Sequence, residues 1–164
     1  MFNNEDKYDD LIFKNAAAFN VPPTLIKAVI AKESSFNEKA IHYDKDENGK
    51  VFNVSYGLMQ LSWNVAISLG FPGKPGTESF LMEPSTNIYY GVKLLSQIMR
   101  NYTDPKDIYA VYNSGKIRKN SYGEYTNSKG NTQVNTNVEK FYQYLLYFEK
   151  VMTPPNGGGE IPPQ

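Results

Sequence analysis

Apolar residues recur at intervals of three and four along most of the chain, a spacing that predicts helices. Segments with this pattern cover residues 8–19, 24–34, 84–102, 105–115 and 134–152. Pro22-Pro23 precedes the second segment and Pro84 opens the third, as expected where helices begin. A shorter helix is expected from Trp63 to Leu69. The pattern therefore predicts a mainly α-helical protein.

Residues 40–56 follow a different pattern, which predicts a short β-hairpin. Residues 44–50 are rich in turn-forming side chains, with Asn48-Gly49 favoured for the turn itself. From Val51 to Tyr56 apolar and polar side chains alternate, as they do in a half-buried strand. The expected fold class is a helical domain that carries one small hairpin.

The chain has 164 residues, a length that suits a single domain with a real core. We place this domain at residues 1–152. Residues 116–133 are polar and irregular, and a loop of that length in a compact domain is usually functional or disordered. Residues 153–164 are rich in proline and glycine, which is linker composition, so a further domain could follow them.

Composition narrows the classes of function. Lys+Arg and Asp+Glu balance at 17 each, so no bulk charge favours nucleic acid or an anionic membrane. The chain has no cysteine and one histidine, which excludes disulfides, thiolate metal sites and multi-histidine sites; we expect no metal and no cofactor. The 13 tyrosines suit sugars, which present apolar ring faces beside hydroxyl groups.

No targeting or membrane-spanning segment is expected from the sequence. The first seven residues lack the basic-then-apolar layout of a signal peptide, and no apolar run reaches the length that spans a membrane. If the protein acts outside a cell, we expect another route to deliver it.

Glu33 is the residue whose position points most clearly to chemistry. Leu25, Val29 and Glu33 fall on one helical face, so the carboxyl group continues an apolar stripe at the C-terminal end of the helix. Partial burial and the negative end of the helix dipole both disfavour its charged form, which predicts a raised pKa and suits a general acid. The alternative is a glutamate at the rim of the core, paired with lysine or arginine. Helix position alone favours that alternative, so the neighbouring residues must decide.

Four short motifs occur in order along the chain: Glu33-Ser34-Ser35-Phe36-Asn37, Gly57-Leu58-Met59-Gln60, Asn87-Ile88 with Gly91, and Tyr112-Asn113-Ser114-Gly115. Together they resemble the soluble lytic transglycosylase family and its goose-type lysozyme relatives, over residues 8–150. Each motif alone is weak, whereas four in register make a specific pattern. The resemblance implies a lysozyme-like α-helical fold that cleaves the MurNAc–GlcNAc β-1,4 bond of peptidoglycan glycan strands.

The resemblance also implies roles for individual residues. Glu33 corresponds to the catalytic acid, and the expected substrate-binding residues are Ser34, His42, Gly57, Met59, Gln60, Tyr112 and Asn113. Gly57 would allow close backbone approach, and Met59 would offer soft apolar area to a sugar face. The amide groups of Gln60 and Asn113 suit N-acetyl groups and hydroxyls. Tyr112 lies on the apolar face of its helix, so a core role is nearly as well supported as a cleft role.

Glu33 has no obvious carboxylate partner, which favours a lytic transglycosylase with one glutamate as acid and base. A hydrolytic muramidase on the same fold is the alternative enzyme; Asp44 or Asp46 would then hold a water, although both suit solvated turn positions better. Asp44, Asp46 and Asn48 also resemble half of a calcium loop, but Ser55 stands where such loops carry a bidentate glutamate. A non-catalytic peptidoglycan-binding module is the alternative of another class.

Three departures from the family pattern qualify the resemblance. The interval from Glu33 to Gly57 is longer than usual, which indicates the hairpin-bearing subgroup, and Ser55 replaces an aspartate common there. Asn137-Val138 stands where the family has Tyr-Val, so Tyr142 or Tyr144 would have to orient Glu33 instead. The linker composition and the absence of a leader favour the catalytic domain of a phage or mobile-element cell-wall lysin.

Overall fold

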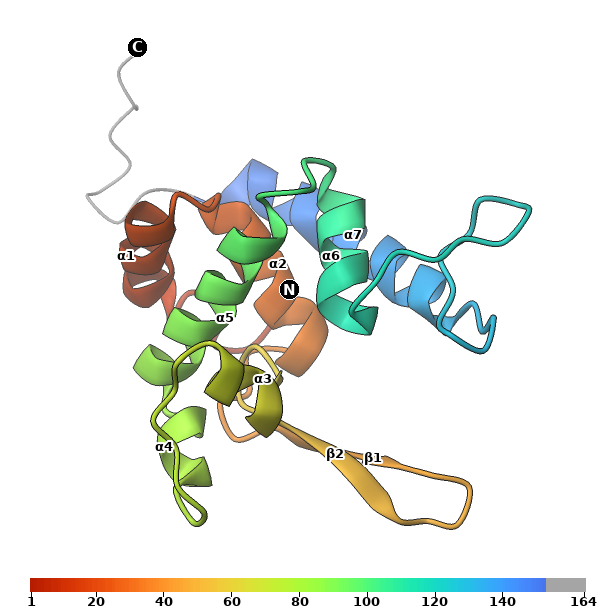
Figure 1. Ribbon diagram of the computed structural model, residues 1–164. Coiled ribbons are helices and arrows are strands. Elements are labelled where there is room, and N and C mark those ends of the chain that lie inside the picture. The colour runs from red at the N-terminus through yellow and green to blue at the C-terminus, as the bar shows by residue number, and fades with distance from the viewer. Residues whose placement is uncertain (153–164) are drawn as a thin grey trace.

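The computed structural model describes residues 1–152, so the expected linker at 153–164 lies outside the described residues. The described elements are α1 (Asp9–Phe19), α2 (Pro23–Ser34), β1 (Ile41–Lys45), β2 (Val51–Tyr56), β3 (Leu61–Ser62), α3 (Trp63–Ser68), α4 (Glu78–Met82), α5 (Pro84–Ile98), α6 (Pro105–Ser114) and α7 (Gln133–Val151). They form a mainly helical body from which a small antiparallel sheet projects (Figure 1), which confirms the predicted fold class. Across residues 1–152, every helix is too short or too polar to cross a bilayer.

Proline and left-handed residues bound the helices as the sequence predicts. α2 begins at Pro23, where a missing N–H group costs nothing, and Ser35 ends it at a positive φ of 51°. Gly115 ends α6 at a φ of 80°, a conformation that glycine adopts without strain. The short elements α4 and β3 were not predicted, because five and two residues are too few to show a period.

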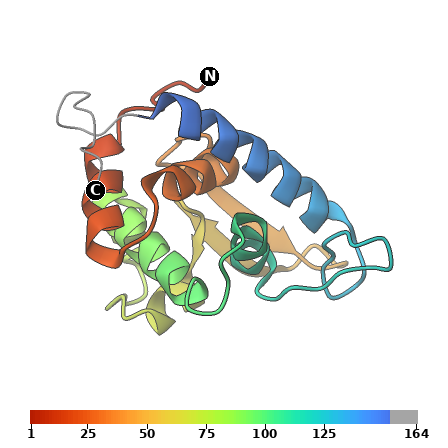
Figure 2. The same cartoon turned by 90° about the horizontal axis from the view of Figure 1, so that it is seen from above.

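α2 is the central helix of the body. Every residue from Leu25 to Ala31 is buried, against α7 on one side and α1 on another (Figure 2). The burial includes Lys27, whose amine donates to Asp6 at 2.9 Å and Asp9 at 2.7 Å. A helix buried all round is fixed by packing on all its faces. The end of α2, where Glu33 lies, is therefore held rigidly by the core.

The hairpin forms where the sequence places it. β1 pairs antiparallel with β2, and β2 pairs with the two residues of β3. At the tip, the Asp46 carboxylate accepts hydrogen bonds from the backbone N–H groups of Asn48 and Lys50, both at 2.9 Å. This arrangement is the solvated turn role expected for Asp46. Most hairpin side chains are exposed, so it extends away from the helices (Figure 1).

The loop 57–60 is clamped onto α5 by Asn87, which is completely buried. Its carboxamide oxygen accepts from the Met59 N–H at 2.7 Å, and its nitrogen donates to the carbonyls of Tyr56 at 2.8 Å and Leu81 at 2.9 Å. Gly91, one turn further along α5, leaves the space in which the Met59 side chain packs. The second and third sequence motifs thus form one packed unit that joins the hairpin to α5.

We predict that Gly57→Ala destabilises the protein far more than Gly49→Ala. Both glycines have a φ of +79°, so the left-handed strain of about 1 kcal/mol is matched. At Gly49 an added methyl group meets open space, whereas at Gly57 it would lie 2.5 Å from the Asn87 amide nitrogen. Urea unfolding should give Gly57→Ala an extra loss of about 2 kcal/mol. Equal losses in the two variants would show that the clamp is not tight.

Candidate active site

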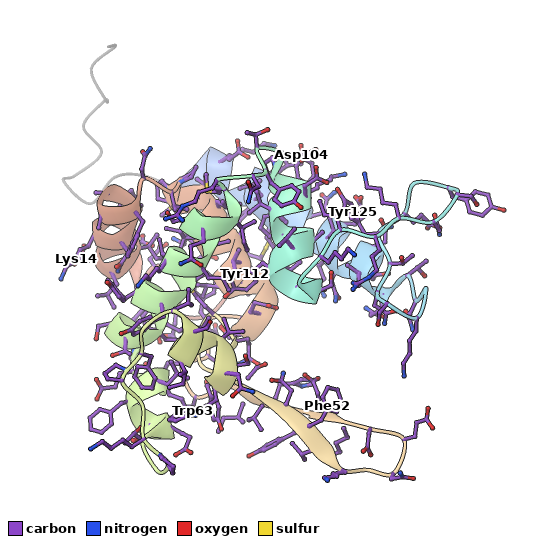
Figure 3. The ribbon with its side chains drawn as sticks, in the orientation of Figure 1. Lys14, Phe52, Trp63, Asp104, Tyr112 and Tyr125 are labelled. Carbon is purple, nitrogen blue, oxygen red and sulfur yellow. The ribbon has the colours of Figure 1, made fainter. Side chains whose placement is uncertain are left out.

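A cavity of about 720 Å³ lies where α2, the hairpin, α6 and the start of α7 meet. Glu33, Asp44, Tyr112 and Asn137 lie in its wall, one from each of these elements. Figure 3 shows Tyr112 near the centre of the molecule, and the hairpin with Phe52 and the 116–132 segment with Tyr125 projecting on the same side of it. The cavity therefore brings together residues from distant parts of the sequence.

Glu33 lies in the last turn of α2 with its carboxyl group at this cavity. Its carboxylate accepts a hydrogen bond from the Tyr109 hydroxyl at 3.2 Å. Burial raises the pKa of Glu33 to about 7; the charge of Lys32 and the bond from Tyr109 act in the opposite direction. None of the ion pairs found within residues 1–152 includes Glu33. The structure thus supports the poorly hydrated acid over the rim glutamate paired with a base.

Tyr109 is the tyrosine that holds Glu33, and sequence reasoning missed it. The expectation that Tyr142 or Tyr144 would take this place is wrong. Tyr142 lies under the Lys106 amine, 4.6 Å from its ring centre, and Tyr144 packs on Phe2. Tyr109 precedes Tyr112 by three residues and so shares its helical face, which is the signal that could have identified it.

The two tyrosines of α6 are fixed in different ways. Tyr109 is fully buried and stacks on Phe141, with ring centres 4.4 Å apart. The Tyr112 hydroxyl donates to the Met59 carbonyl and so ties α6 to the clamped loop. Burial raises the pKa of both phenols well above the ordinary value, so both keep their protons and act as donors.

The cavity brings together five of the predicted site residues: Glu33, His42, Gln60, Tyr112 and Asn113. Ser34, Gly57 and Met59 are not among its lining residues. The Ser34 hydroxyl donates to the Ile30 carbonyl at 3.1 Å, and Gly57 lies beneath Asn87. The Met59 side chain is fully buried, so the expectation that it offers apolar area to a sugar is wrong. What Met59 provides is a backbone N–H group that bonds to Asn87.

Gln60 combines a strained backbone with a fixed side chain. It has a positive φ of 51°, and its amide nitrogen donates to the carbonyls of Gly57 at 2.9 Å and Ala40 at 3.1 Å. These bonds occupy the donor end of the amide. Its carbonyl oxygen is left as the end that can accept from a ligand in the cavity.

The hairpin contributes four residues to the cavity wall: His42, which was expected there, Asp44, which was expected mainly in a turn, and Asn53 and Ser55, which were not expected as site residues. Asp44 lies in the cavity wall, where one oxygen accepts from the Asn53 amide at 2.8 Å and the other lies 3.1 Å from the His42 ring. His42 and Asp44 alternate along β1 and pair with Ser55 and Asn53 of β2, so all four share one face. That alternation is the signal that could have placed Asp44, Asn53 and Ser55 at the site beside His42.

Metal binding receives no support from the arrangement of ligands. Within residues 1–152, no group of three carboxylate, histidine or thiol side chains comes together. One oxygen of the Asp46 carboxylate, which would begin a calcium loop with Asp44, already accepts from two backbone N–H groups of the hairpin turn.

Comparison with known families decides the classification. The family described as "Transglycosylase SLT domain" matches residues 10–135. The chain belongs to this family.

Curated relatives of this SLT-domain protein include proteins from Shigella and Yersinia. It is 30% identical over 106 residues to protein IpgF of Shigella flexneri, a match that covers 65% of this chain and 66% of IpgF. It is also 34% identical over 100 residues to membrane-bound lytic murein transglycosylase C of Yersinia pestis. This second match covers 58% of this chain and 25% of that protein. The chain thus spans just under two thirds of IpgF and a quarter of transglycosylase C.

Solved structures share the fold. The lytic transglycosylase Slt from Pseudomonas aeruginosa superposes with a TM-score of 0.63 at 20% identity, over 88% of this chain and 24% of that one. The 70 kDa soluble lytic transglycosylase from Escherichia coli gives a TM-score of 0.61 at 21% identity, over 87% of this chain and 24% of that one. These likenesses confirm the lysozyme-like transglycosylase fold of this SLT domain.

We predict that Glu33→Gln stabilises the SLT domain at alkaline pH. An acid whose folded pKa is raised from 4.5 to about 7 binds its proton more tightly in the folded state, so stability is lost as pH rises through this window. The loss amounts to about 3 kcal/mol and is absent from the variant. Urea unfolding of both proteins at about pH 4 and pH 8 measures it. A variant that is no more stable than the parent at the higher pH would contradict the raised pKa.

Proposed function

We propose that this SLT domain is a lytic transglycosylase that cleaves the MurNAc–GlcNAc β-1,4 bond of peptidoglycan, with Glu33 as general acid and then general base. The observation that carries the proposal is a carboxyl group at the cavity wall with its pKa raised to about 7 by burial. Such a group holds a proton near neutral pH and can also release it, as both halves of the reaction require. Similarity to lytic murein transglycosylase C supports the same chemistry.

In the first half of the proposed reaction, protonated Glu33 donates its proton to the glycosidic oxygen. The bond between that oxygen and C1 of MurNAc breaks, and its electron pair leaves with the oxygen. The N-acetyl oxygen of the substrate stabilises the cationic C1. Tyr109 keeps its hydrogen bond to Glu33 and stabilises the carboxylate that forms.

In the second half, the Glu33 carboxylate takes the proton of the MurNAc C6 hydroxyl. The freed oxygen bonds to C1, which closes the 1,6-anhydro ring and returns Glu33 to its starting state. The nucleophile is already attached to the sugar, so no water has to be positioned. One carboxyl group therefore suffices for the whole reaction.

A hydrolytic muramidase is the second candidate, because Asp44 lies in the wall of the same cavity as Glu33. The Asn53 amide and the His42 ring hold its carboxylate in place, where it could orient a water for attack on C1. The two reactions differ in their product: hydrolysis leaves a reducing end, whereas transglycosylation leaves an anhydro end.

We predict that digestion of purified peptidoglycan gives anhydro ends and that Asp44→Asn preserves them. The substitution removes the charge of Asp44 but keeps its shape, and the proposed reaction uses no second carboxylate. Mass spectrometry of the digest should show the anhydro product formed within about threefold of the parent rate. Reducing ends that disappear in Asp44→Asn would establish the muramidase instead.

We predict that Glu33→Gln loses turnover while it retains binding. The amide cannot donate or accept the transferred proton, so the rate should fall about 10²–10⁴-fold, and sedimentation with insoluble wall should be unchanged. Lysis that is unaffected by the substitution would show that Glu33 is not the acid, and wall binding with no turnover in either protein would favour a non-catalytic peptidoglycan-binding module.

The setting of the domain forms part of the proposal. Action on the bacterial cell wall follows from the proposed substrate. The proline- and glycine-rich composition of residues 153–164 is typical of a linker, which agrees with a modular lysin of the phage or mobile-element kind.

A further inference from the structure

We propose that a second cavity, between α1, α4 and α5, binds the anionic stem peptide of peptidoglycan and so anchors the domain to the wall. The inference rests on the proposed substrate, and it adds a binding site that the proposed reaction does not use. The cavity measures about 740 Å³ and shares no lining residue with the cavity of Glu33. Figure 3 shows Lys14, which lies in its wall, at the opposite edge of the molecule from Phe52 of the hairpin.

Ordered aromatic rings form one wall of this second cavity. Tyr89 and Tyr90 of α5 meet edge to face with ring centres 4.9 Å apart, and Phe71 packs against Tyr90 at 5.6 Å. Phe19 of α1 packs edge-on against Tyr89 at 5.2 Å. These contacts fix the rings in place, so the wall is formed before a ligand binds. Tyr89 is still 40% exposed and Phe80 57% exposed, which leaves apolar area for a ligand to cover.

The charge of the cavity wall favours an anion. Lys14 and Lys74 are the charged residues that line it, and no carboxylate from residues 1–152 does so. Neither lysine takes part in any ion pair found in that part of the chain. A ligand with carboxylate groups therefore meets two ammonium groups that have no acidic partner of their own.

Asn15 adds a buried acceptor to the same cavity. This lining residue is only 5% exposed, and its amide nitrogen donates to the Leu11 carbonyl at 2.8 Å. No donor within residues 1–152 reaches its carbonyl oxygen, yet no side-chain oxygen of those residues is both sealed from solvent and unbonded. The oxygen therefore opens onto the cavity, where it can accept from an N–H or O–H group of a ligand.

These features together fit a short peptide with carboxylate groups. A stem peptide presents amide N–H groups and alanine methyl groups, and its γ-linked D-glutamate and terminal D-alanine each have a free carboxylate. An uncharged sugar would leave both lysines without a partner, and an acyl chain would leave the Asn15 oxygen without a donor. A peptide bound here leaves the Glu33 cavity open to a glycan strand, so the wall is held at two points.

The test measures the binding of an N-acetylated stem tetrapeptide to the full chain by isothermal titration calorimetry. Lys14→Gln combined with Lys74→Gln removes both charges at exposed positions and should weaken binding about tenfold. As the control, Lys140→Gln combined with Lys150→Gln removes the same charge from exposed positions of α7 and should leave the affinity unchanged. Equal affinities in the two double variants, or no binding to the parent, would overturn the proposal.

The matching change can be made in the ligand. A tetrapeptide whose two carboxylates are converted to carboxamides should bind the parent about tenfold more weakly. For this ligand the double substitution at Lys14 and Lys74 should cost nothing further, because the charge pairs are already absent. A further tenfold loss would show that the two lysines do not contact the carboxylates, and would contradict the assignment.

Nitrogen-15 NMR spectra locate the bound peptide. The side-chain amide signals of Asn15 and the backbone signal of Tyr89 should move on titration. The signals of Gln60 and Asn113, in the wall of the Glu33 cavity, should stay in place. Movement confined to the Glu33 cavity would assign the peptide to the site already described. An uncharged N-acetylglucosamine oligosaccharide that moves the Asn15 signals equally would show a sugar site, and movement on concentrating the protein alone would show a second copy; either result would refute the peptide site.

Intact wall gives a second readout. After sedimentation with insoluble wall, the double variant at Lys14 and Lys74 should leave more protein in the supernatant than the control pair, and equal amounts would contradict the anchoring role. The peptide titrations need no turnover, so they test this cavity even if no anhydro product forms. Peptide binding without anhydro product would refute the proposed reaction alone, whereas anhydro product without peptide binding would refute the second site alone.

Discussion

The proposed chemistry depends on one carboxyl group, that of Glu33, in which the effect of burial is opposed by a nearby positive charge and a hydrogen bond. Burial at the end of α2 raises its pKa, and the charge of Lys32 and the Tyr109 hydroxyl partly offset that effect. With more burial the group would never ionise and could not act as a base; with more donors it would never hold a proton. A pKa of about 7 lies between these limits, where one group can serve as both acid and base.

The motifs that identify the family act mainly as scaffolding for this balance. Asn87 clamps the loop that contains Met59, and Tyr112 bonds to the Met59 carbonyl on the other side. Tyr112 and Tyr109 lie on the same face of α6, so the loop that fixes the first tyrosine also fixes the second. The motifs at residues 57–60, 87–91 and 112–115 are thereby joined to one another, and α6 links them to Glu33 through Tyr109. The fold positions the acid, whereas the residues around the acid determine which reaction takes place.

The sequence predicts the elements well where a repeating pattern or a terminating residue is present. The long helices follow from apolar spacing, the hairpin from its turn residues, and the burial of Glu33 from its place in the stripe with Leu25 and Val29. Contacts between elements that are distant in the sequence could not be predicted from it. Tyr109 is 76 residues from Glu33, and Asp44 enters the cavity only because β1 pairs with β2. Met59 was misjudged because its burial depends on the space beside Gly91.

The most direct measurement is the protonation state of Glu33 itself, observed by infrared difference spectroscopy between the parent protein and Glu33→Gln. A neutral carboxylic acid absorbs apart from carboxylates and amides. We predict that the acid band of Glu33 is present at about pH 6 and disappears by about pH 8, as it must for a group with a pKa of about 7. A spectrum with no acid band at about pH 6, which would mean a fully ionised Glu33, would contradict the account.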